Sequence, residues 1–153
     1  RWGAGILHPS PSGMAVFVML NPSTADAEKD DPTIRRCIAF AESWGQAGLI
    51  VVNLFGWRAT DPAELQTAID PEGPQNMRYI INAAETARDL GSPIVCAWGA
   101  HKMAVPQGRK VIDRLQHTFG VWERVHFFVR TRSGAPKHPL FVRADQPLQR
   151  WTP

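Results

Sequence analysis

The sequence predicts an α/β fold: a three-layer α/β/α sandwich around a central four-stranded, mostly parallel sheet. Three observations support this. Four short apolar runs recur along the 153 residues, helical patterns stand between them, and most of the runs are continuous rather than alternating. Continuous apolar runs are typical of parallel strands that are covered on both faces. Because parallel neighbours are joined by right-handed crossovers, helices then cover both sides of the sheet.

The apolar runs give the strands and the first helix between them. The predicted strands are residues 14–20 (MAVFVML), 49–55 (LIVVNLF), 93–98 (PIVCAW) and 124–130 (RVHFFVR). After the first strand, Asp31 is a candidate N-cap and Pro32 suits the first helical position. Apolar residues then recur at i, i+3, i+4 and i+7 from Ile34, which predicts an amphipathic helix.

Two more helices complete the pattern. An apolar stripe over residues 79–87 ends at Gly91, a typical helix stop. Another runs over residues 111–119, begins near Pro106 and ends at Gly120. The order is therefore β-α-β-α-β-α-β with no internal repeat, and we expect one domain over residues 1–153.

Composition excludes several classes of protein. With 44% hydrophobic and 20% charged residues, the chain suits a domain that buries about 70% of its unfolded surface. No apolar run approaches the roughly 20 residues that span a bilayer. Cys37 and Cys96 lie in apolar contexts, so we expect buried thiols and a cytoplasmic protein. We also expect a monomer. The chain starts at Arg1 instead of Met, and we expect its natural N-terminus to be missing.

Charge is distributed unevenly along the chain. Residues 1–100 carry 7 Lys and Arg against 11 Asp and Glu, whereas residues 101–153 carry 10 against 3. This asymmetry favours a face that meets an anion, with nucleic acid the obvious candidate. A solvated basic surface explains the charge equally well.

A ligand site is expected where the strands end, because sites in open α/β sheets lie outside the carboxyl ends of the strands. Residues 21–26, 56–61, 99–102 and 131–139 follow the strands and are rich in polar groups. Neither G-x-G-x-x-G nor a P-loop occurs, and G-x-S-x-G is absent. No His, Cys or Asp cluster has metal-ligand spacing, so we expect no cofactor and no metal.

Four strand-end motifs together resemble the uracil-DNA glycosylase superfamily. Residues 19–22 (MLNP) resemble its first-strand motif, 51–54 (VVNL) its second, 97–102 (AWGAHK) its third, and 137–140 (KHPL) a shortened last motif. The resemblance covers residues 14–142. Three further segments (NPSTAD, DPTIRRC and VNLF with RATDP) more closely resemble the bacterial domain-of-unknown-function family numbered 1643.

The superfamily resemblance implies a monofunctional DNA glycosylase, a hydrolase that cleaves the N-glycosidic bond of a flipped altered or modified base. It assigns Asn21 to position water and His138 to stabilise the departing base. Asn21 has no ionisable oxygen, so Asp26 or Asp31 could supply the base, although capping is the more ordinary role for Asp31. The residues expected to bind the base or its flanking phosphates are Asn53, Pro22, Ser23, Thr24, Trp57 and Trp98. The residues expected to contact the DNA backbone or wedge into the stack are Arg58, Arg132, Lys137, Leu140, Phe141 and Arg143.

Some readings stay open. Uracil-DNA glycosylases carry a tyrosine where this chain has Ser23, which implies a pocket open to larger bases on single- or double-stranded DNA. A hydrolase or transferase for free nucleosides, or a non-catalytic nucleic-acid-binding module, fits the same residues. Residues 8–11 (HPSP) spell the last glycosylase motif more faithfully than His138 does. They precede the first strand, at the opposite edge of the sheet, so we assign the role to His138.

Overall fold

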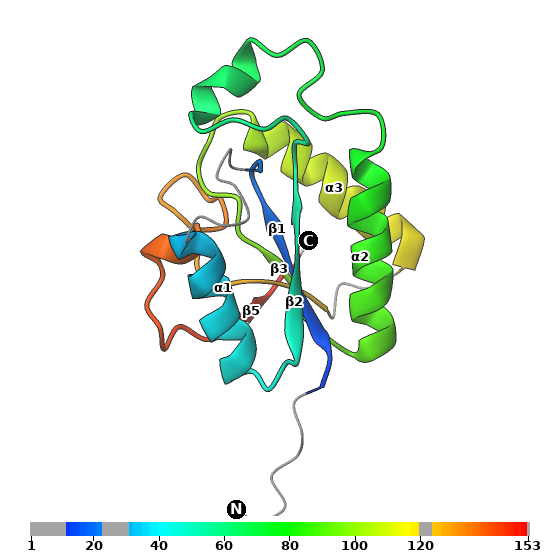
Figure 1. Ribbon diagram of the computed structural model, residues 1–153, viewed down its shortest axis with the longest axis vertical. Helices are drawn as coiled ribbons and strands as arrows, with labels where there is room; N and C mark the ends of the chain where they lie inside the picture. The colour runs from blue at the N-terminus through cyan, green and yellow to red at the C-terminus, as the bar shows by residue number, and fades with distance from the viewer. Residues whose placement is uncertain (1–11, 23–30, 120–123, 153) are drawn as a thin grey trace, which may run out of the picture.

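The computed structural model describes residues 12–22, 31–119 and 124–152. The strands are β1 (Met14–Met19), β2 (Gly48–Asn53), β3 (Ile94–Cys96), β4 (Val125–Phe127) and β5 (Gln149–Arg150). The helices are α1 (Pro32–Ser43), α2 (Asn76–Leu90) and α3 (Ala104–Phe119), with short 3-10 helices η1 (Pro62–Gln66) and η3 (Pro139–Phe141). The chain therefore alternates strands and helices as predicted (Figure 1).

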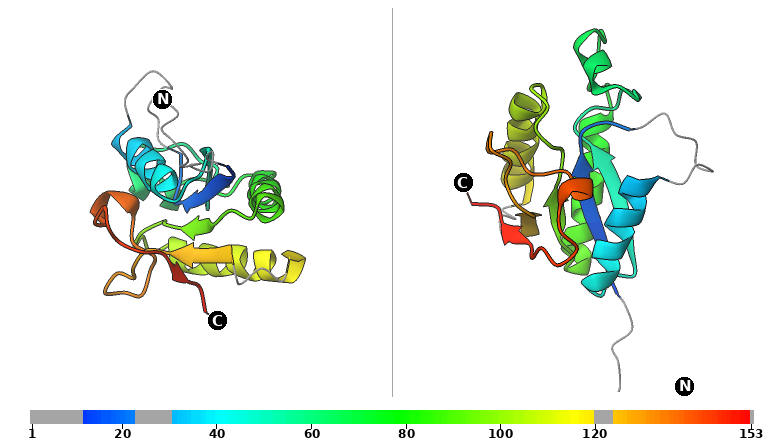
Figure 2. Two further views of the ribbon diagram at one scale, coloured as in Figure 1. Left: turned by 90° about the horizontal axis from the view of Figure 1, so that it is seen from below. Right: turned by 90° about the vertical axis from the view of Figure 1, so that its left-hand side faces the viewer.

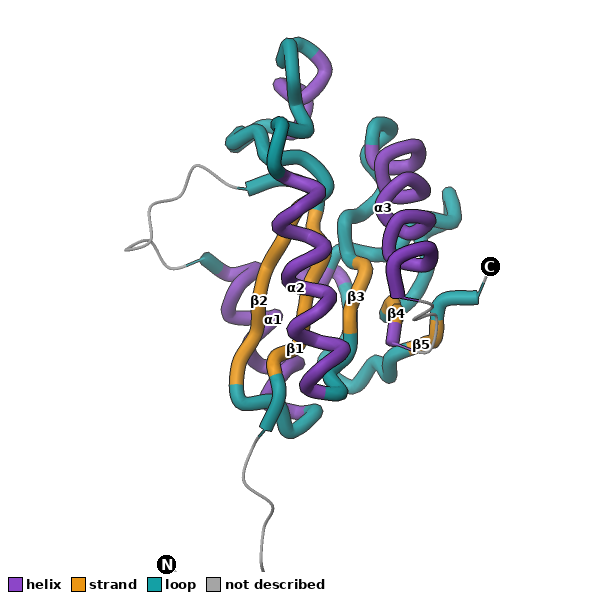
Figure 3. The backbone as a smooth tube through the Cα atoms, turned by 90° about the vertical axis from the view of Figure 1, so that its right-hand side faces the viewer, coloured by secondary structure: helices purple, strands orange, loops and turns teal. Residues whose placement is uncertain are grey.

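The strands form one mixed sheet in the order β2-β1-β3-β4-β5, which Figure 3 shows from the side of α2. β1 to β4 are parallel, and β5 pairs antiparallel with β4. The predicted number of four strands is wrong because it omits β5. That strand has two residues, both exposed, and so carries no apolar pattern that a sequence could display.

Two apolar cores lie on opposite faces of the sheet, which makes the domain three-layered. Alternate residues of β1 divide between them: Phe17 packs in the core with α1, and Val16 in the core with α2 and α3. η3 packs beside α1 on the first face (Figures 1 and 2). Burial of β1 and β3 on both faces is the physical reason for their continuous apolar sequences.

The helix ends follow their predicted signals closely. Asp31 caps α1 by accepting hydrogen bonds from the backbone N–H groups of Thr33 (2.8 Å) and Ile34 (3.4 Å), ahead of Pro32. Gly91 ends α2 in the left-handed conformation (φ 67°) that glycine adopts without steric cost. α3 begins at Ala104, two residues before the predicted Pro106.

Both cysteines are buried and unpaired, as predicted. Burial raises the pKa of the Cys37 thiol to about 12, with a smaller contribution from the charge of Asp31. Burial likewise raises the pKa of Cys96, in the middle of the sheet. Both side chains therefore stay protonated and act as small core residues rather than nucleophiles.

The segment between β2 and α2 rises above the carboxyl ends of the strands (Figure 1). Its two ends are tied together, because Gly56 N–H donates to the Glu72 carbonyl (3.0 Å) and Trp57 N–H donates to the Pro71 carbonyl (3.1 Å). Leu65, fully buried, anchors its 3-10 helix. This segment forms one wall above the end of the sheet at which a ligand site is expected.

Candidate functional site

A cleft of about 430 Å³ lies at the carboxyl ends of the parallel strands. β1 lies between β2 and β3, and the chain leaves β1 into α1 on one face of the sheet but leaves β3 into α3 on the other face. Such a switch point is where open α/β sheets bind ligands. The lining residues are Met19, Leu20, Asn21, Pro22, Asp31, Thr33, Ile34, Val51, Asn53, Arg58, Ala59, Thr60, Pro62, Trp98 and His138.

Asn21 follows β1 and is held by its own amide nitrogen. Nδ2 donates to the backbone carbonyls of Ala59 (2.9 Å) and Pro22 (3.1 Å), and Ala59 N–H donates back to the Pro22 carbonyl (3.2 Å). These bonds attach the end of β1 to the segment after β2. They use both hydrogens of the amide, and Oδ1 accepts no hydrogen bond from any described residue. Asn21 therefore presents a fixed acceptor.

Asn53 is the last residue of β2 and pairs in register with Met19 of β1. It follows Val51 by two positions, so both side chains project from the face that carries α1, and both line the cleft. Its backbone carbonyl accepts a hydrogen bond from Nδ2 of Asn76 (2.8 Å). That bond fixes the strand end and leaves the Asn53 amide without a partner among the described residues.

His138 enters the cleft from the segment after β4. It caps η3, with its Nδ1 accepting a hydrogen bond from the backbone N–H of Leu140 (3.3 Å). Burial lowers the pKa of His138, and the charge of Asp31 opposes that shift. The imidazole is therefore neutral near pH 7, and because Nδ1 is an acceptor, the proton resides on Nε2.

Gly99 lies where the chain after β3 passes close to His138. It has φ of 77°, which disfavours any other residue, and its N–H donates to the Pro136 carbonyl (2.9 Å). The neighbouring Trp98 is 4% exposed and forms a wall of the cleft. Its ring packs against Trp151, with the ring centroids 5.9 Å apart.

The N-cap and the first turn of α1 form another part of the lining, through Asp31, Thr33 and Ile34. Among the described residues that line the cleft, Asp31, Arg58 and His138 are the ones that can carry charge. The sequence predicts capping as the ordinary role of Asp31 and a general base as the alternative role. Asp31 caps its helix, and it also lines the cleft.

A comparison with models of protein families identifies the family of this chain. A model of the family described as "Protein of unknown function (DUF1643)" matches residues 6–140. The chain belongs to the DUF1643 family. No curated protein and no solved structure matches it significantly. The matched range of this DUF1643 protein contains every residue that lines the cleft.

Six of the residues expected to act line this one cleft: Asn21, Pro22, Asn53, Arg58, Trp98 and His138. They come from all four parallel strand ends of the DUF1643 domain, which is the convergence that the strand-end argument predicted. Ser23, Thr24 and Asp26 lie outside the described residues, as does the alternative motif at residues 8–11.

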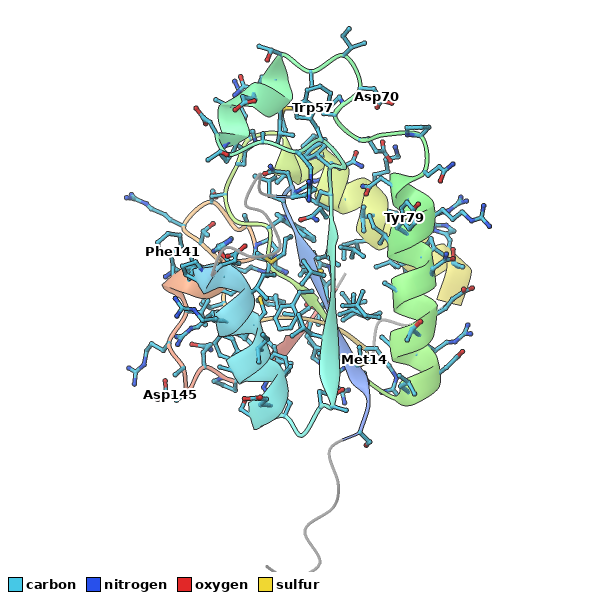
Figure 4. The ribbon with its side chains drawn as sticks, in the orientation of Figure 1. Met14, Trp57, Asp70, Tyr79, Phe141 and Asp145 are labelled. Carbon is cyan, nitrogen blue, oxygen red and sulfur yellow. The ribbon has the colours of Figure 1, made fainter. Side chains whose placement is uncertain are left out.

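The other expected residues lie outside the cleft. Trp57 is 46% exposed in the segment above the sheet, and Phe141 is 71% exposed beside α1 (Figure 4). Leu140 is exposed next to it. Arg143 forms an exposed ion pair with Asp145 (3.0 Å). The remaining two, Arg132 and Lys137, belong to the loop that leads to His138.

A second cavity, of about 490 Å³, lies between α3 and the loop after β4, and Trp98 borders it too. The guanidinium of Arg130 lies over the rings of Phe127 (4.4 Å) and Trp151 (4.6 Å) there. Arg109 of α3 forms another part of the lining. Sequence reasoning missed this cavity because Trp151 follows the unpredicted strand β5.

Two kinds of feature are absent from the part of the chain that the structure describes. No group of three or more His, Cys, Asp or Glu side chains in residues 12–22, 31–119 and 124–152 has the geometry of a metal site. Within the same ranges, no helix combines the length and the apolar character needed to cross a bilayer.

Proposed function

We propose that this DUF1643 protein is a DNA glycosylase-like hydrolase that cleaves the N-glycosidic bond of an altered or modified base. One observation carries the proposal: His138, whose Nδ1 accepts a hydrogen bond from Leu140 and whose pKa is lowered by burial, shares a strand-end cleft with the amides of Asn21 and Asn53. The resemblance of the four strand-end motifs to the uracil-DNA glycosylase superfamily supports it.

His138 has the properties of the donor that this reaction requires. As the glycosidic bond lengthens, negative charge develops on the base and positive charge on the sugar. A donor aimed at a carbonyl oxygen of the base stabilises that negative charge, and such a donor contributes about 3–4 kcal/mol. The Leu140 N–H fixes the tautomer that places the donating hydrogen on Nε2. Burial keeps the ring neutral, so that it donates without transferring a proton.

The two asparagines suit the other tasks of base excision. A flipped base is read through hydrogen bonds to its edge. The Asn53 amide offers both a donor and an acceptor and has no partner among the described residues. The Oδ1 atom of Asn21 is held in place by the bonds of Nδ2, and it is suited to accept a hydrogen bond from the attacking water.

Charge favours a nucleic-acid substrate over a free nucleoside. In the described part of the cleft Arg58 offsets the charge of Asp31, and the last 53 residues of the chain have an excess of basic over acidic side chains. Arg132 and Lys137 precede His138 on the same loop. Contacts between basic side chains and the phosphates of a nucleic acid make binding strongly dependent on salt. A nucleoside hydrolase would show no such dependence.

The test is base release from a panel of oligonucleotides that contain uracil, hypoxanthine, thymine mismatches and 5-modified cytosines. His138→Asn keeps a side-chain oxygen for the Leu140 N–H but loses the Nε2 donor, and should lower release about 10²–10³-fold. His117→Asn is the matched control, because His117 is exposed on α3 and bonds the Asp113 carbonyl (2.7 Å). It should leave release unchanged.

Two other outcomes would overturn the proposed activity, and a third would overturn the role of His138. DNA binding without base release by the wild type would favour a binding module. Release from free nucleosides alone, independent of salt, would favour a nucleoside hydrolase. Equal release by wild type and His138→Asn would remove His138 from the reaction.

A further inference from the structure

Asp31 occupies two environments at once. It is the N-cap of α1, and it lines the cleft together with His138. Both cap bonds go to one atom, because Oδ1 accepts from the N–H groups of Thr33 (2.8 Å) and Ile34 (3.4 Å). Oδ2 has no hydrogen bond or ion pair with any described residue. One carboxylate oxygen therefore caps the helix, and no described residue bonds the other.

Asp31 and the proposed donor, His138, line the same cleft, and the charge of the carboxylate acts on the imidazole. That negative charge raises the pKa of the ring against the larger effect of burial. Arg58 is the other ionisable side chain among the described residues of the cleft. Asn21, the residue that fits a water-positioning role, has no group that can accept a proton. The described cleft therefore contains one carboxylate that can.

We infer that Asp31 is the general base of the site; the inference rests on the proposed glycosylase function. As the C1′–N bond breaks, its electron pair leaves with the base. Water held by Asn21 then bonds to C1′, and Oδ2 of Asp31 takes the proton that the water loses. The proton passes afterwards to the anionic base, which leaves neutral and regenerates the carboxylate. The sugar keeps a hydroxyl group, so atoms and charge balance.

Asp31→Asn separates this role from capping. Asparagine is about as good an N-cap as aspartate, so the helix keeps its acceptor while the site loses its proton acceptor. We expect the single-turnover rate of base release to fall at least about 10²-fold, in the range of general-base catalysis. Affinity for the oligonucleotide and the melting temperature should stay close to those of the wild type.

Asp61→Asn is the matched control. Asp61 caps η1 in the same way, with Oδ1 accepting from the Ala63 N–H (2.9 Å), but it is exposed and does not line the cleft. Its substitution should leave the rate unchanged. The pKa of His138, measured by NMR, is a second readout: it should fall in Asp31→Asn, where the opposing charge is gone, and stay constant in Asp61→Asn.

The outcomes distinguish this inference from the proposed function. Base release by Asp31→Asn within threefold of the wild type would overturn the role of Asp31 and leave the glycosylase proposal standing. A slow rate accompanied by a large drop in melting temperature would overturn it as well, since capping would then explain the loss. A wild type that releases no base from any substrate would overturn both.

Discussion

Replacing Gly108 with alanine tests how tightly Trp98 is held at the wall of the cleft. Gly108 lies in α3, and a Cβ atom placed there would be 2.6 Å from Cζ2 and 2.9 Å from Cε2 of the Trp98 ring. Ordinary contact begins at 3.4 Å, so the ring or the helix must move by the better part of an ångström. Trp98 is confined on another side by Trp151, which limits how far it can retreat.

Two effects of known size oppose each other. Alanine is favoured over glycine in a helix interior by about 1 kcal/mol, whereas overpacking a core costs about 1–3 kcal/mol. We therefore expect Gly108→Ala to lower the free energy of unfolding by about 1 kcal/mol. In a chain of this size that corresponds to a fall in melting temperature of about 2–4 °C. Urea denaturation followed by circular dichroism measures it.

The double variant with Trp98→Phe removes the cause of the clash. Phenylalanine lacks the fused ring whose atoms meet the new Cβ, so in that background Gly108→Ala should stabilise the protein through helix propensity alone. The change of sign is a coupling between the two positions. If Gly108→Ala stabilised the wild type by about 1 kcal/mol, Trp98 would be free to move and the packing argument would be refuted.

Two further predictions concern stability. Ser92 is fully buried and its Oγ accepts the Met14 N–H (2.9 Å), so Ser92→Ala should cost about 1–3 kcal/mol in urea denaturation. Thr118→Ala, which removes an exposed hydroxyl, should change stability by no more than about 0.5 kcal/mol, and equal losses would contradict the argument. Burial lowers the pKa of both His126 and His138, so stability should be complete above the pKa of an unfolded histidine, about 6.5, and fall as the pH drops below it. A variant with asparagine at both positions should show a flatter pH dependence of the urea midpoint between pH 5 and 7.5.

The sequence predicts the fold well wherever the burial of an element requires a recognisable pattern of apolar residues. β1 and β3 are covered on both faces, and their continuous apolar runs identify them. The Asp31 cap and the Gly91 stop are set by local chemistry and are therefore readable without a structure. β5 could not be predicted, because its two residues are exposed and join the sheet through backbone hydrogen bonds alone. A pairing of that kind depends on where β4 already lies.

The candidate site is predictable to the extent that topology determines it. Parallel strands bring their carboxyl ends to one edge, so Asn21, Asn53 and Trp98 could be placed together from order alone. His138 was assigned to the site because it follows the fourth parallel strand, and not because of the spelling of its local motif. Trp57 does not line the cleft, because the segment after β2, whose two ends are joined by hydrogen bonds, extends beyond the carboxyl ends of the strands and leaves the indole 46% exposed.

Three polar side chains of the cleft share one arrangement: one atom of each bonds the protein backbone, and a second atom bonds no described residue. Asn21 uses Nδ2 to hold the backbone of Ala59, and its Oδ1 has no partner among the described residues. In the same part of the chain His138 uses Nδ1 to cap η3 while Nε2 has no partner, and Asp31 divides its two oxygens in the same way. Each group is thus fixed in orientation, and under the proposed function this lowers the reorganisation needed when charge develops.

This arrangement also dictates how the site should be dissected. Alanine at any of these three positions removes the backbone anchor and the available atom together, so a loss of activity would not separate folding from chemistry. Asp31→Asn and His138→Asn keep an oxygen for the anchored N–H and change the other half of the side chain. A site of this kind should therefore lose activity in these two variants while its melting temperature changes little. Comparable losses of both would mean that the side chains are structural caps that happen to border a cleft.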